Sequence, residues 1–541
     1  MIVWNIYWST RSECRHIYVN DGIRPRSFAS HHVAPMPPAP STGFRVKAVV
    51  TCLHIWPSRG SNQRFLQLKS KPNIIFIFAD DYGYHDVGYH NSDIKTPVLD
   101  QLAAGGVKLE NYYVQPLCSP SRSQFMSGRY QIHTGLQHGV ILATQPNALP
   151  LGSATIADKM KDAGYSTYAV GKWHLGFYKN AYLPTNRGFD SFYGYLTGKE
   201  NYYTHSHCDF FNTSICGHDL RDNTKSVFTE NGHYSTHLFT EKAIDIIQKH
   251  DKAKPFFLYL AYQSTHIPLQ VPSQYMDQYS HINDTKRRTF AGMTTCMDEG
   301  IGNVTAALKA SGQLANTLIV FSADNGGQVS EGASNWPLRG TKGTLWEGGI
   351  RAVGFVYGDM LKNKGTINRQ MIHVSDWFPT LVGMAGGNTN GTKPLDGFDQ
   401  WKTISENSAS PRTEILHNID PLAKPRGQKF YNNTFDTRIR AAIRVGKWKL
   451  ITGNPDETFV PPLLGKEPNV ERVDALKNIL LFNIPDDPSE RHDVSAANPD
   501  VVKELLNRLA NYQKTAVTPV FPDADPKCDP KLHGGVWTPW E

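Results

Sequence analysis

Between residues 71 and 400, short apolar runs recur along the chain, and each is followed by glycine or polar residues. The runs are continuously apolar rather than alternating, which is typical of strands buried on both faces of a parallel sheet. Their lengths suit strands, and the polar residues after them mark where each strand ends. The clearest four runs are residues 73–78, 166–170, 255–262 and 318–321.

Amphipathic stretches lie between these runs and predict helices. Apolar side chains recur at helical spacing in residues 235–249 and again in residues 293–308. Cys296 falls on the apolar stripe of the second stretch and is expected to be a buried free thiol. A further helix is expected to end at Gly164, because glycine is a common stop signal of helices. Helices that alternate with apolar strands indicate a layered α/β domain around a central sheet.

After about Pro394 the pattern changes, and a smaller domain is expected there. Residues 441–451 contain two short β-rich runs around Gly446, and residues 501–512 are amphipathic with helical spacing. Strands followed by a terminal helix indicate a small α+β domain. A chain of 541 residues also exceeds what a single hydrophobic core usually serves.

We therefore expect three segments. Residues 1–70 show neither helical nor strand periodicity and include a proline-rich piece, so they are interpreted as a leader or a disordered segment. Residues 71–400 form the large domain, and residues 401–541 form the small one.

The formal net charge of +7 belongs to the N-terminal segment and does not indicate a nucleic-acid-binding protein. Residues 1–70 hold nine lysines and arginines against two carboxylates, so residues 71–541 are formally neutral. A protein that binds a polyanion such as nucleic acid carries an excess of basic residues on its folded domain. Residues 71–541 have no such excess, so we expect no binding to nucleic acid. No apolar run approaches the roughly 20 residues that a helix needs to cross a bilayer, so no membrane span is expected.

Polar residues follow the ends of the predicted strands. The carboxyl ends of parallel strands meet at one edge of a sheet, where open α/β sheets bind ligands, so we expect these side chains to form one site. In chain order they are Asp80, Asp81, Lys172, His174, His266, Asp324 and Asn325, and Lys342 follows in a glycine-rich loop.

The acidic members of this set indicate a divalent cation. Three carboxylates and one amide are hard oxygen ligands, suited to Ca²⁺ or Mg²⁺ rather than to zinc. The alternative is structural: Asp80 or Asp81 would cap a helix, and Asp324 with Asn325 would form an Asx turn. The structural alternative leaves neighbouring carboxylates repelling one another, and a bound cation would relieve that repulsion.

The basic members have simple alternatives when each is taken alone. A lone lysine such as Lys172 or Lys342 is most often a solvated surface residue. His174 and His266 would each be an ordinary polar residue with its hydrogen bonds satisfied. Only their grouping favours a functional role: Lys172, His174 and His266 come after predicted strands, and Lys342 lies in the glycine-rich loop that follows.

Cys118 precedes Arg122 by four residues, and residues 121–127 have a composition that a helix tolerates. A helix N-terminus presents free N–H groups and favours anions, so Cys118 is a candidate for a low-pKa thiolate nucleophile. For a single cysteine the simpler interpretation is a loop residue near a helix start.

The residues around Cys118 favour a functional role for this cysteine over that of an ordinary loop residue. Residues 118–122, Cys-Ser-Pro-Ser-Arg, followed by Gly128 and Arg129, resemble the signature of type I sulfatases. In that family the cysteine is oxidised to Cα-formylglycine, and the hydrate of its aldehyde is the nucleophile. The resemblance runs from about residue 71 to the C-terminus.

Further motifs narrow the resemblance. Residues 164–174 are similar to the second sulfatase signature, and residues 263–272 and 335–349 resemble the arylsulfatase B (N-acetylgalactosamine-4-sulfatase) and arylsulfatase I/J branch. The resemblance implies an alkaline-phosphatase-like α/β domain with a central mixed sheet, plus a smaller C-terminal domain. It also implies one Ca²⁺, and the ligands would be Asp80, Asp81, Cys118 in its modified form, Asp324 and Asn325.

The other matching residues acquire roles from the same resemblance. Lys172 and Lys342 would neutralise the sulfate oxygens. Arg122 and His174 would hold the hydroxyl groups of the hydrate. His266 would protonate the leaving sugar oxygen, on which charge builds as the S–O bond breaks.

The chain departs from the family at four positions. Ser127 stands where the family usually has threonine, and His133 stands where arginine is common. Thr144 and Ala148 replace cysteines of vertebrate arylsulfatase B, so Cys528 is expected to lack its family partner.

The resemblance implies a sulfuric ester hydrolase acting on a sulfated glycan, GalNAc 4-sulfate of chondroitin or dermatan sulfate. Its second partner would be the formylglycine-generating enzyme. A lysosomal or secreted location is expected, where Cys208 and Cys216 would pair and Asn-x-Ser/Thr sequons such as Asn212 permit glycosylation. Residues 1–70 contain no convincing signal peptide, because polar residues interrupt their apolar stretches. We therefore expect the mature chain to begin shortly before Lys71.

Three alternatives remain open. The first is an arylsulfatase with a different sulfated substrate. The second is a hydrolase of phosphate or phosphonate esters, which would carry serine or threonine in place of Cys118. The third is a non-catalytic glycan-binding relative, which would have lost a metal ligand or a sulfate-binding lysine; none is missing in this chain.

Overall fold

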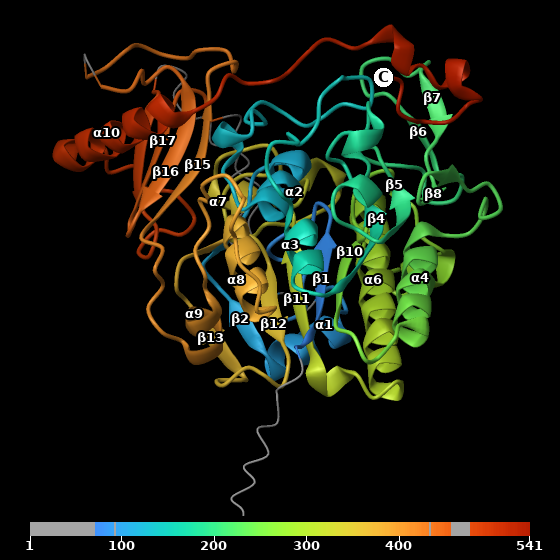
Figure 1. Ribbon diagram of the computed structural model, residues 1–541. Coiled ribbons are helices and arrows are strands. Elements are labelled where there is room, and N and C mark those ends of the chain that lie inside the picture. Colours follow the sequence, from blue (N-terminus) through green and yellow to red (C-terminus); the bar gives the residue numbers. More distant parts are fainter. Residues whose placement is uncertain (1–70, 91–92, 432–433, 456–476) are drawn as a thin grey trace, which may run out of the picture. The chain divides into compact units, whose positions relative to one another are not determined.

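Figure 1 shows the chain in a computed structural model, which describes residues 71–90, 93–431, 434–455 and 477–541. The predictions about residues 1–70 lie outside the described residues. Among the helices that are described, none combines the length and the hydrophobicity that a membrane span requires.

A mixed sheet of ten strands forms the centre of the large domain, as the resemblance implies. In sheet order its strands are β13 (Thr366–Asn368), β2 (Val107–Leu109), β12 (Gly354–Tyr357), β11 (Thr317–Ala323), β1 (Asn73–Ala79), β10 (Phe256–Ala261), β4 (Ser166–Lys172), β5 (Ser191–Tyr195), β8 (Arg221–Asp222) and β9 (Lys225–Ser226). The strands β11, β1, β10, β4 and β5 are parallel neighbours, whereas β12 and β8 join this block antiparallel. All four predicted strand runs are therefore confirmed, and they lie side by side at the middle of the sheet.

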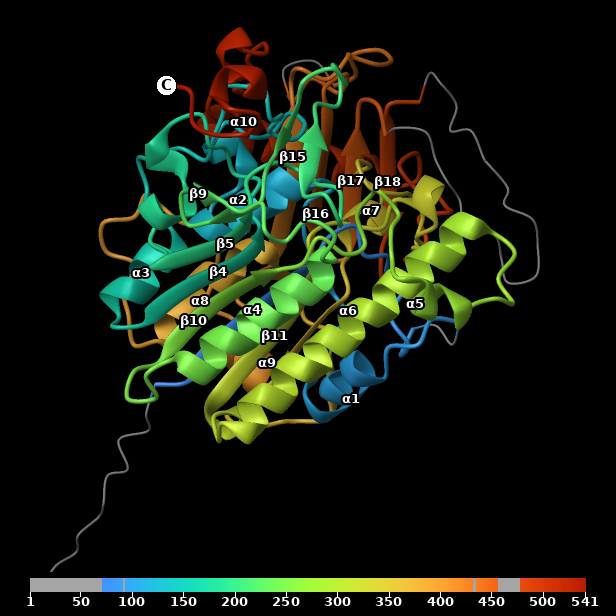
Figure 2. The ribbon, with the colours of Figure 1, turned by 90° about the vertical axis from the view of Figure 1, so that its right-hand side faces the viewer.

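Helices cover both faces of this sheet (Figure 2). One face carries α1 (Pro97–Gly105), α4 (Ser235–Lys249) and α6 (Thr285–Ala310), and the other carries α2 (Cys118–Ser127), α3 (Ile156–Asp162) and α8 (Trp377–Met384). Because both faces are covered, every residue of β1 is buried. This double burial explains why the strand runs are apolar throughout rather than alternating.

The predicted helices are confirmed as well. The helix predicted for residues 235–249 is α4, and α6 contains the predicted stretch 293–308. Helix α3 ends two residues before Gly164, whose φ of +85° is the left-handed conformation that glycine adopts freely. The short helices are α5 (Ser273–Asp277), α7 (Glu347–Ile350) and α9 (Trp401–Glu406).

A separate antiparallel sheet forms the smaller C-terminal unit. Its strands are β15 (Glu414–Asp420), β16 (Arg440–Val445), β17 (Trp448–Thr452) and β18 (Ile479–Asn483), and α10 (Pro499–Thr515) packs on one face. On the other face, Leu345 and Trp346 of the large domain pack among Ala442, Ile451 and Phe482. The small sheet therefore lies between its own helix and the loop that carries Lys342.

Two small sheets complete the described strands, one of β3 (Tyr112–Tyr113) with β14 (Ile372–His373) and one of β6 (Ser206–Cys208) with β7 (Cys216–His218). A disulfide joins Cys208 to Cys216 across the second, as predicted. Cys296 and Cys528 are buried free thiols, which confirms the predictions for both.

Candidate active site

The parallel strands bring the predicted residues to one edge of the sheet. Asp80 follows β1, Asp324 follows β11, and Lys172 is the last residue of β4. His266 follows β10, which lies between β1 and β4. Since these strands are adjacent and point the same way, residues up to 244 positions apart in sequence become neighbours.

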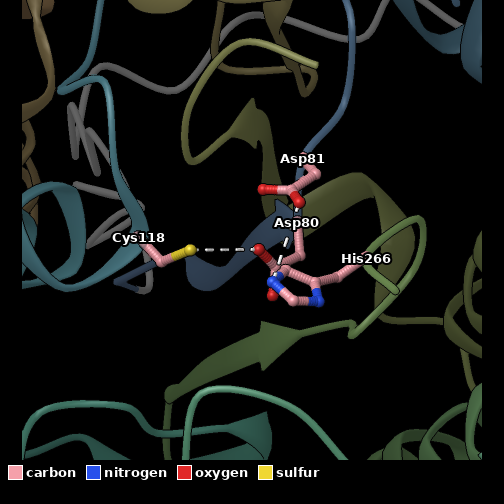
Figure 3. A group of neighbouring side chains, drawn as sticks. All are labelled: Asp80, Asp81, Cys118 and His266. Carbon is pink, nitrogen blue, oxygen red and sulfur yellow. Dashed lines mark hydrogen bonds and ion pairs between the residues drawn. The ribbon is translucent and has the colours of Figure 1, made fainter. Parts of the chain in front are cut away.

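Cys118 is the first residue of α2, and its side chain is directed at this edge (Figure 3). Its Sγ lies 3.5 Å from Asp80 Oδ1, and the residue is buried. Burial raises the pKa of the thiol well above its usual value, although Lys172 and Lys342 act in the opposite direction. The prediction of a thiolate nucleophile is therefore wrong for the unmodified cysteine.

Lys172 and Lys342 each form an ion pair with one of two consecutive aspartates, Asp80 and Asp81. Lys172 pairs with Asp80, with both side chains fully buried, and Lys342 Nζ lies 2.7 Å from Asp81 Oδ2. Burial disfavours the charges of Asp81 and Lys342, but the attraction between the two charges outweighs this effect. The pKa of Asp81 is therefore lowered and the pKa of Lys342 is raised. The interpretation of these lysines as solvated surface residues is therefore wrong.

Arg122 is fully buried and held in place by several acceptors. Its Nε and Nη2 donate to Asp324 Oδ2 at 3.0 and 2.8 Å. Its Nη1 donates to the Lys172 carbonyl and to the Tyr259 hydroxyl, each at 3.2 Å. A guanidinium fixed in this way keeps one orientation beside Cys118, one helical turn away on α2.

The two histidines each have one ring nitrogen available to the site. His174 Nε2 donates to the Ile141 carbonyl at 2.9 Å, and its Nδ1 is buried without a partner in the described part of the chain. His266 Nδ1 donates to the Ile267 carbonyl at 2.7 Å, which leaves Nε2 3.7 Å from Asp81 Oδ2. Burial and the Lys342 charge lower the pKa of His266 to about 3, so the ring is neutral in the free protein.

The backbone is strained at two of these residues. Asp81 and His174 have φ values of +58° and +54°, a left-handed conformation that costs a residue with a side chain free energy. Both lie directly after strands that end at the site. Such strain persists only where the surrounding contacts hold it, and here those contacts are the ion pairs and hydrogen bonds of the site.

The acidic residues fit a divalent cation. Ligand atoms of Asp80, Asp81, Cys118 and His266 all lie within 4.8 Å of one another. Next to them, Asn325 Nδ2 donates to Asp81 Oδ1 at 2.8 Å, while Asn325 Oδ1 is buried without a partner among the described residues. An orphaned amide oxygen beside crowded carboxylates is what a hard cation would satisfy.

Asp324 shows the cost of that crowding. Burial and the neighbouring Asp80 raise the pKa of Asp324 to about 6. Its Oδ2 accepts from Arg122 and its Oδ1 from the Asp81 N–H at 3.3 Å. Asp324 and Asn325 therefore both contact Asp81, next to the group formed by Asp80, Asp81, Cys118 and His266. His266, which was predicted only as an acid, is a member of that group.

Sequence reasoning missed the residues that hold the Lys342 loop. Glu347 at the start of α7 and Glu490 of the C-terminal unit both pair with Lys449 of β17, at 3.0 and 2.7 Å. The Glu347 N–H donates to Glu490 Oε2 at 2.6 Å, and Arg440 Nη2 donates to the Gly343 carbonyl at 2.6 Å. Nothing in the local sequence marks these residues, because their partners are distant along the chain.

Three of the residues that depart from the family pattern make hydrogen bonds away from the proposed ligands and lysines. His133 Nδ1 contacts Asp396 at 2.8 Å and its Nε2 contacts Thr515 at 2.9 Å. Thr144 Oγ1 donates to Asp209 Oδ2 at 3.1 Å. Ser127 Oγ donates to the Ser123 carbonyl at 2.6 Å, one turn back in α2.

The fold brings two lysines paired with aspartates, a group of ligand atoms that could hold a cation and a buried cysteine at a helix start to one edge of the central sheet. A model of the sulfatase domain matches residues 72–387, and the chain belongs to the sulfatase family. It is 53% identical over 483 residues to mouse (Mus musculus) arylsulfatase J, covering 87% of this chain and 80% of that protein. It is 30% identical over 487 residues to human (Homo sapiens) arylsulfatase A, covering 84% and 90%.

Among solved structures, Ps i-CgsB in complex with k-i-k-neocarrahexaose matches with a TM-score of 0.71 and 31% identity. The match covers 86% of this chain and 98% of that one. These findings confirm the expected family and fold. The strong match is to an arylsulfatase J, so the substrate expected from arylsulfatase B stays a proposal.

Proposed function

We propose that this chain is a formylglycine-dependent sulfatase that removes sulfate from a sulfated saccharide, with GalNAc 4-sulfate of chondroitin or dermatan sulfate as the first candidate. The observation that carries the proposal is the position of Cys118: buried, at the start of α2, 3.5 Å from Asp80 and within the electrostatic reach of two lysines. A sulfatase with a different sulfated sugar is the alternative.

The protonation of Cys118 explains why a modification is needed. A buried thiol with a raised pKa is a poor nucleophile. An aldehyde hydrate at the same carbon would supply two hydroxyl groups. One would attack sulfur as the sugar oxygen leaves, and loss of the proton from the other would release sulfate and restore the aldehyde without attack of water at sulfur.

Residues of this chain supply the remaining chemistry. Lys172 and Lys342 are fixed cations, as a transition state with charged sulfate oxygens requires. Arg122 and the unpartnered Nδ1 of His174 would hold the hydroxyl groups of the hydrate. These assignments are supported by the burial and the fixed hydrogen bonds of each group.

His266 would protonate the leaving oxygen through Nε2. In the free protein its pKa is about 3, because of burial and the charge of Lys342. A bound sulfate ester places negative charge against the same lysine, which moves the pKa of His266 upward, the direction that a general acid requires.

The cation site fits the same function. Asp80, Asp81, Asp324 and Asn325 would hold Ca²⁺, which supplies a fixed positive charge at the sulfate. The non-catalytic alternative is disfavoured because this chain has every one of these side chains, and the fold brings them together with both lysines. Cys118 in place of serine or threonine disfavours a phosphatase.

The proposal is tested on protein made in cells that also produce the formylglycine-generating enzyme. Peptide mass spectrometry is expected to show loss of the Cys118 thiol, and hydrolysis of 4-nitrophenyl sulfate and of a panel of sulfated oligosaccharides is then measured. Cys118→Ala is expected to abolish turnover, whereas the matched control Cys296→Ala, at another buried free thiol, keeps it. Full activity with unmodified Cys118 would refute the proposal.

Two further proposals depend on this one. Conversion of Cys118 requires entry into the compartment of the formylglycine-generating enzyme, so we place the protein in the lysosome or outside the cell. The mature chain is then expected to begin shortly before Lys71, and N-terminal sequencing of protein from its source measures this.

A further inference from the structure

A third lysine, Lys199, is held at the edge of the candidate site. On one side of it Gly198 lies so close to the His174 ring that a Cβ there would be 2.9 Å from Cε1 and Nε2. On the other side the Tyr202 hydroxyl donates to the His266 carbonyl at 2.9 Å. The Lys199 carbonyl accepts from Thr197 Oγ1 at 2.9 Å, so Lys199 lies in a held segment whose neighbours contact two residues of the proposed chemistry.

The charge of Lys199 differs from that of the other two lysines in having no counter-ion. Lys172 and Lys342 each pair with an aspartate of the site, but within the described ranges no carboxylate pairs with Lys199. Its Nζ lies 5.9 Å from the centre of the Phe210 ring. Burial, with the like charges of Lys342 and Lys172, lowers the pKa of Lys199, so an anion at this position would be stabilised.

Phe210 lies beside this ammonium group, and the exposed ring of Phe211 lies against Phe210. Phe210 and Phe211 are 67% and 75% exposed, and their ring centres are 5.1 Å apart. They lie in the turn between β6 and β7, which the Cys208–Cys216 disulfide closes. Asp209 Oδ1 accepts the Phe211 N–H at 3.0 Å, so the turn holds both rings outward. Adjacent exposed aromatic rings of this kind mark a binding surface.

We propose that Lys199, Phe210 and Phe211 form a second subsite, at which an oxyanion of the same saccharide binds while the scissile sulfate lies between Lys172 and Lys342. The oxyanion is either a second sulfate or a uronic-acid carboxylate, and the rings contact the apolar face of the sugar. This proposal rests on the sulfatase function and deepens it, because it makes the enzyme selective for substrates with two neighbouring negative charges.

The test compares pairs of substrates that differ by one charge. One pair is GalNAc 4,6-disulfate and GalNAc 4-sulfate, and the other is a uronic-acid–GalNAc 4-sulfate disaccharide and its carboxyl-reduced form. Values of kcat/KM are measured for the converted full-length enzyme and for Lys199→Gln and Lys199→Arg. Lys447→Gln is the matched control, since Lys447 is an exposed lysine with its Nζ 4.9 Å from the Trp448 ring centre, on the separate sheet.

The wild-type enzyme is expected to prefer the doubly charged member of at least one pair, and the pair that shows the preference identifies the oxyanion. Lys199→Gln is expected to lower that preference about tenfold, the factor that corresponds to about 1.4 kcal/mol of lost interaction. Lys199→Arg restores most of the preference and Lys447→Gln leaves it unchanged. The wild-type preference also falls as salt is raised, because added ions screen the interaction.

Three results would overturn the proposal, and they separate its failure from that of the sulfatase function. A wild-type enzyme that cleaves 4-nitrophenyl sulfate and the sugars but shows no preference within either pair removes the second subsite and leaves the sulfatase function intact. The same holds if Lys199→Gln keeps the wild-type preference. A correctly converted enzyme that cleaves no sulfate ester overturns both proposals.

Discussion

Lys449 connects the small sheet to the loop of Lys342, and its replacement by methionine is expected to destabilise both. Its Nζ lies 3.0 Å from Glu347 Oε1 and 2.7 Å from Glu490 Oε1, and all three side chains are fully buried. Removing one partner of a buried ion pair costs about 3–5 kcal/mol, because the remaining charge stays buried without compensation. Here two carboxylates would be left facing each other, so we expect a loss in this range.

The loss is expected to depend on pH. In the wild type, burial raises the pKa of Glu490 to about 7, while Lys449 and the neighbouring arginines hold the pKa of Glu347 below its ordinary value despite burial. Without Lys449 the pKa of Glu490 rises further above that of the unfolded chain, near 4.5, and the pKa of Glu347 rises because the largest charge that lowers it is lost. The folded variant then keeps protons that the unfolded chain has released, so its unfolding free energy falls as pH rises from about 4.5 through 7.

Equilibrium urea unfolding, followed by tryptophan fluorescence at several pH values, measures this effect. Lys447→Met is the matched control: the same substitution two residues away, at an exposed position, is expected to stay within about 0.5 kcal/mol of the wild type. The triple variant Glu347→Gln, Lys449→Met and Glu490→Gln should recover most of the loss, since no buried charge remains unpaired. A Lys449→Met protein as stable as the wild type at pH 7, or equally destabilised at pH 5 and pH 7, would contradict the argument.

Three predictions concern the site itself. Asp324→Ala is expected to abolish turnover and lower the calcium content measured by atomic emission, because Asp80 and Asp81 alone give too few hard ligands; wild-type activity and calcium content would exclude Asp324 from the cation site. Lys342→Ala should weaken sulfate binding and rate together, seen as a raised KM and a lowered kcat on every substrate. His266→Ala should reduce kcat most on alkyl sugar sulfates and least on 4-nitrophenyl sulfate, because only poor leaving groups need a proton; equal losses on both would remove the acid role.

The sequence was sufficient for the central elements of the fold. A strand that is buried on both faces must be apolar at every position, so β1, β10, β4 and β11 could be recognised from composition alone. The helix α4 was predicted with its observed bounds. One face of this helix packs on the sheet, so its apolar residues recur at helical spacing in the sequence. Short strands at or near the sheet edges, such as β8 and β13, carry no such pattern, since only one residue of each is buried.

The candidate site was visible in the sequence for a similar reason. Side chains at the ends of parallel neighbouring strands must meet, so the order of residues along the chain was enough to group Asp80, Lys172, His266 and Asp324. The protonation state of Cys118 could not be predicted in this way. A helix start alone suggests a lowered pKa, but burial decides the outcome, and burial is a property of the packed protein.

Only the tertiary structure decided which charges have partners. Nothing local to Lys172, Lys199, Lys342 or Lys449 in the sequence shows which of these lysines meets a carboxylate. Three of them meet carboxylates across the fold, whereas Lys199 lies beside an aromatic ring at the edge of the site. The periodicity of apolar residues within a segment shows which of its faces is buried. An ion pair depends instead on where the fold places a charge from a second, distant segment.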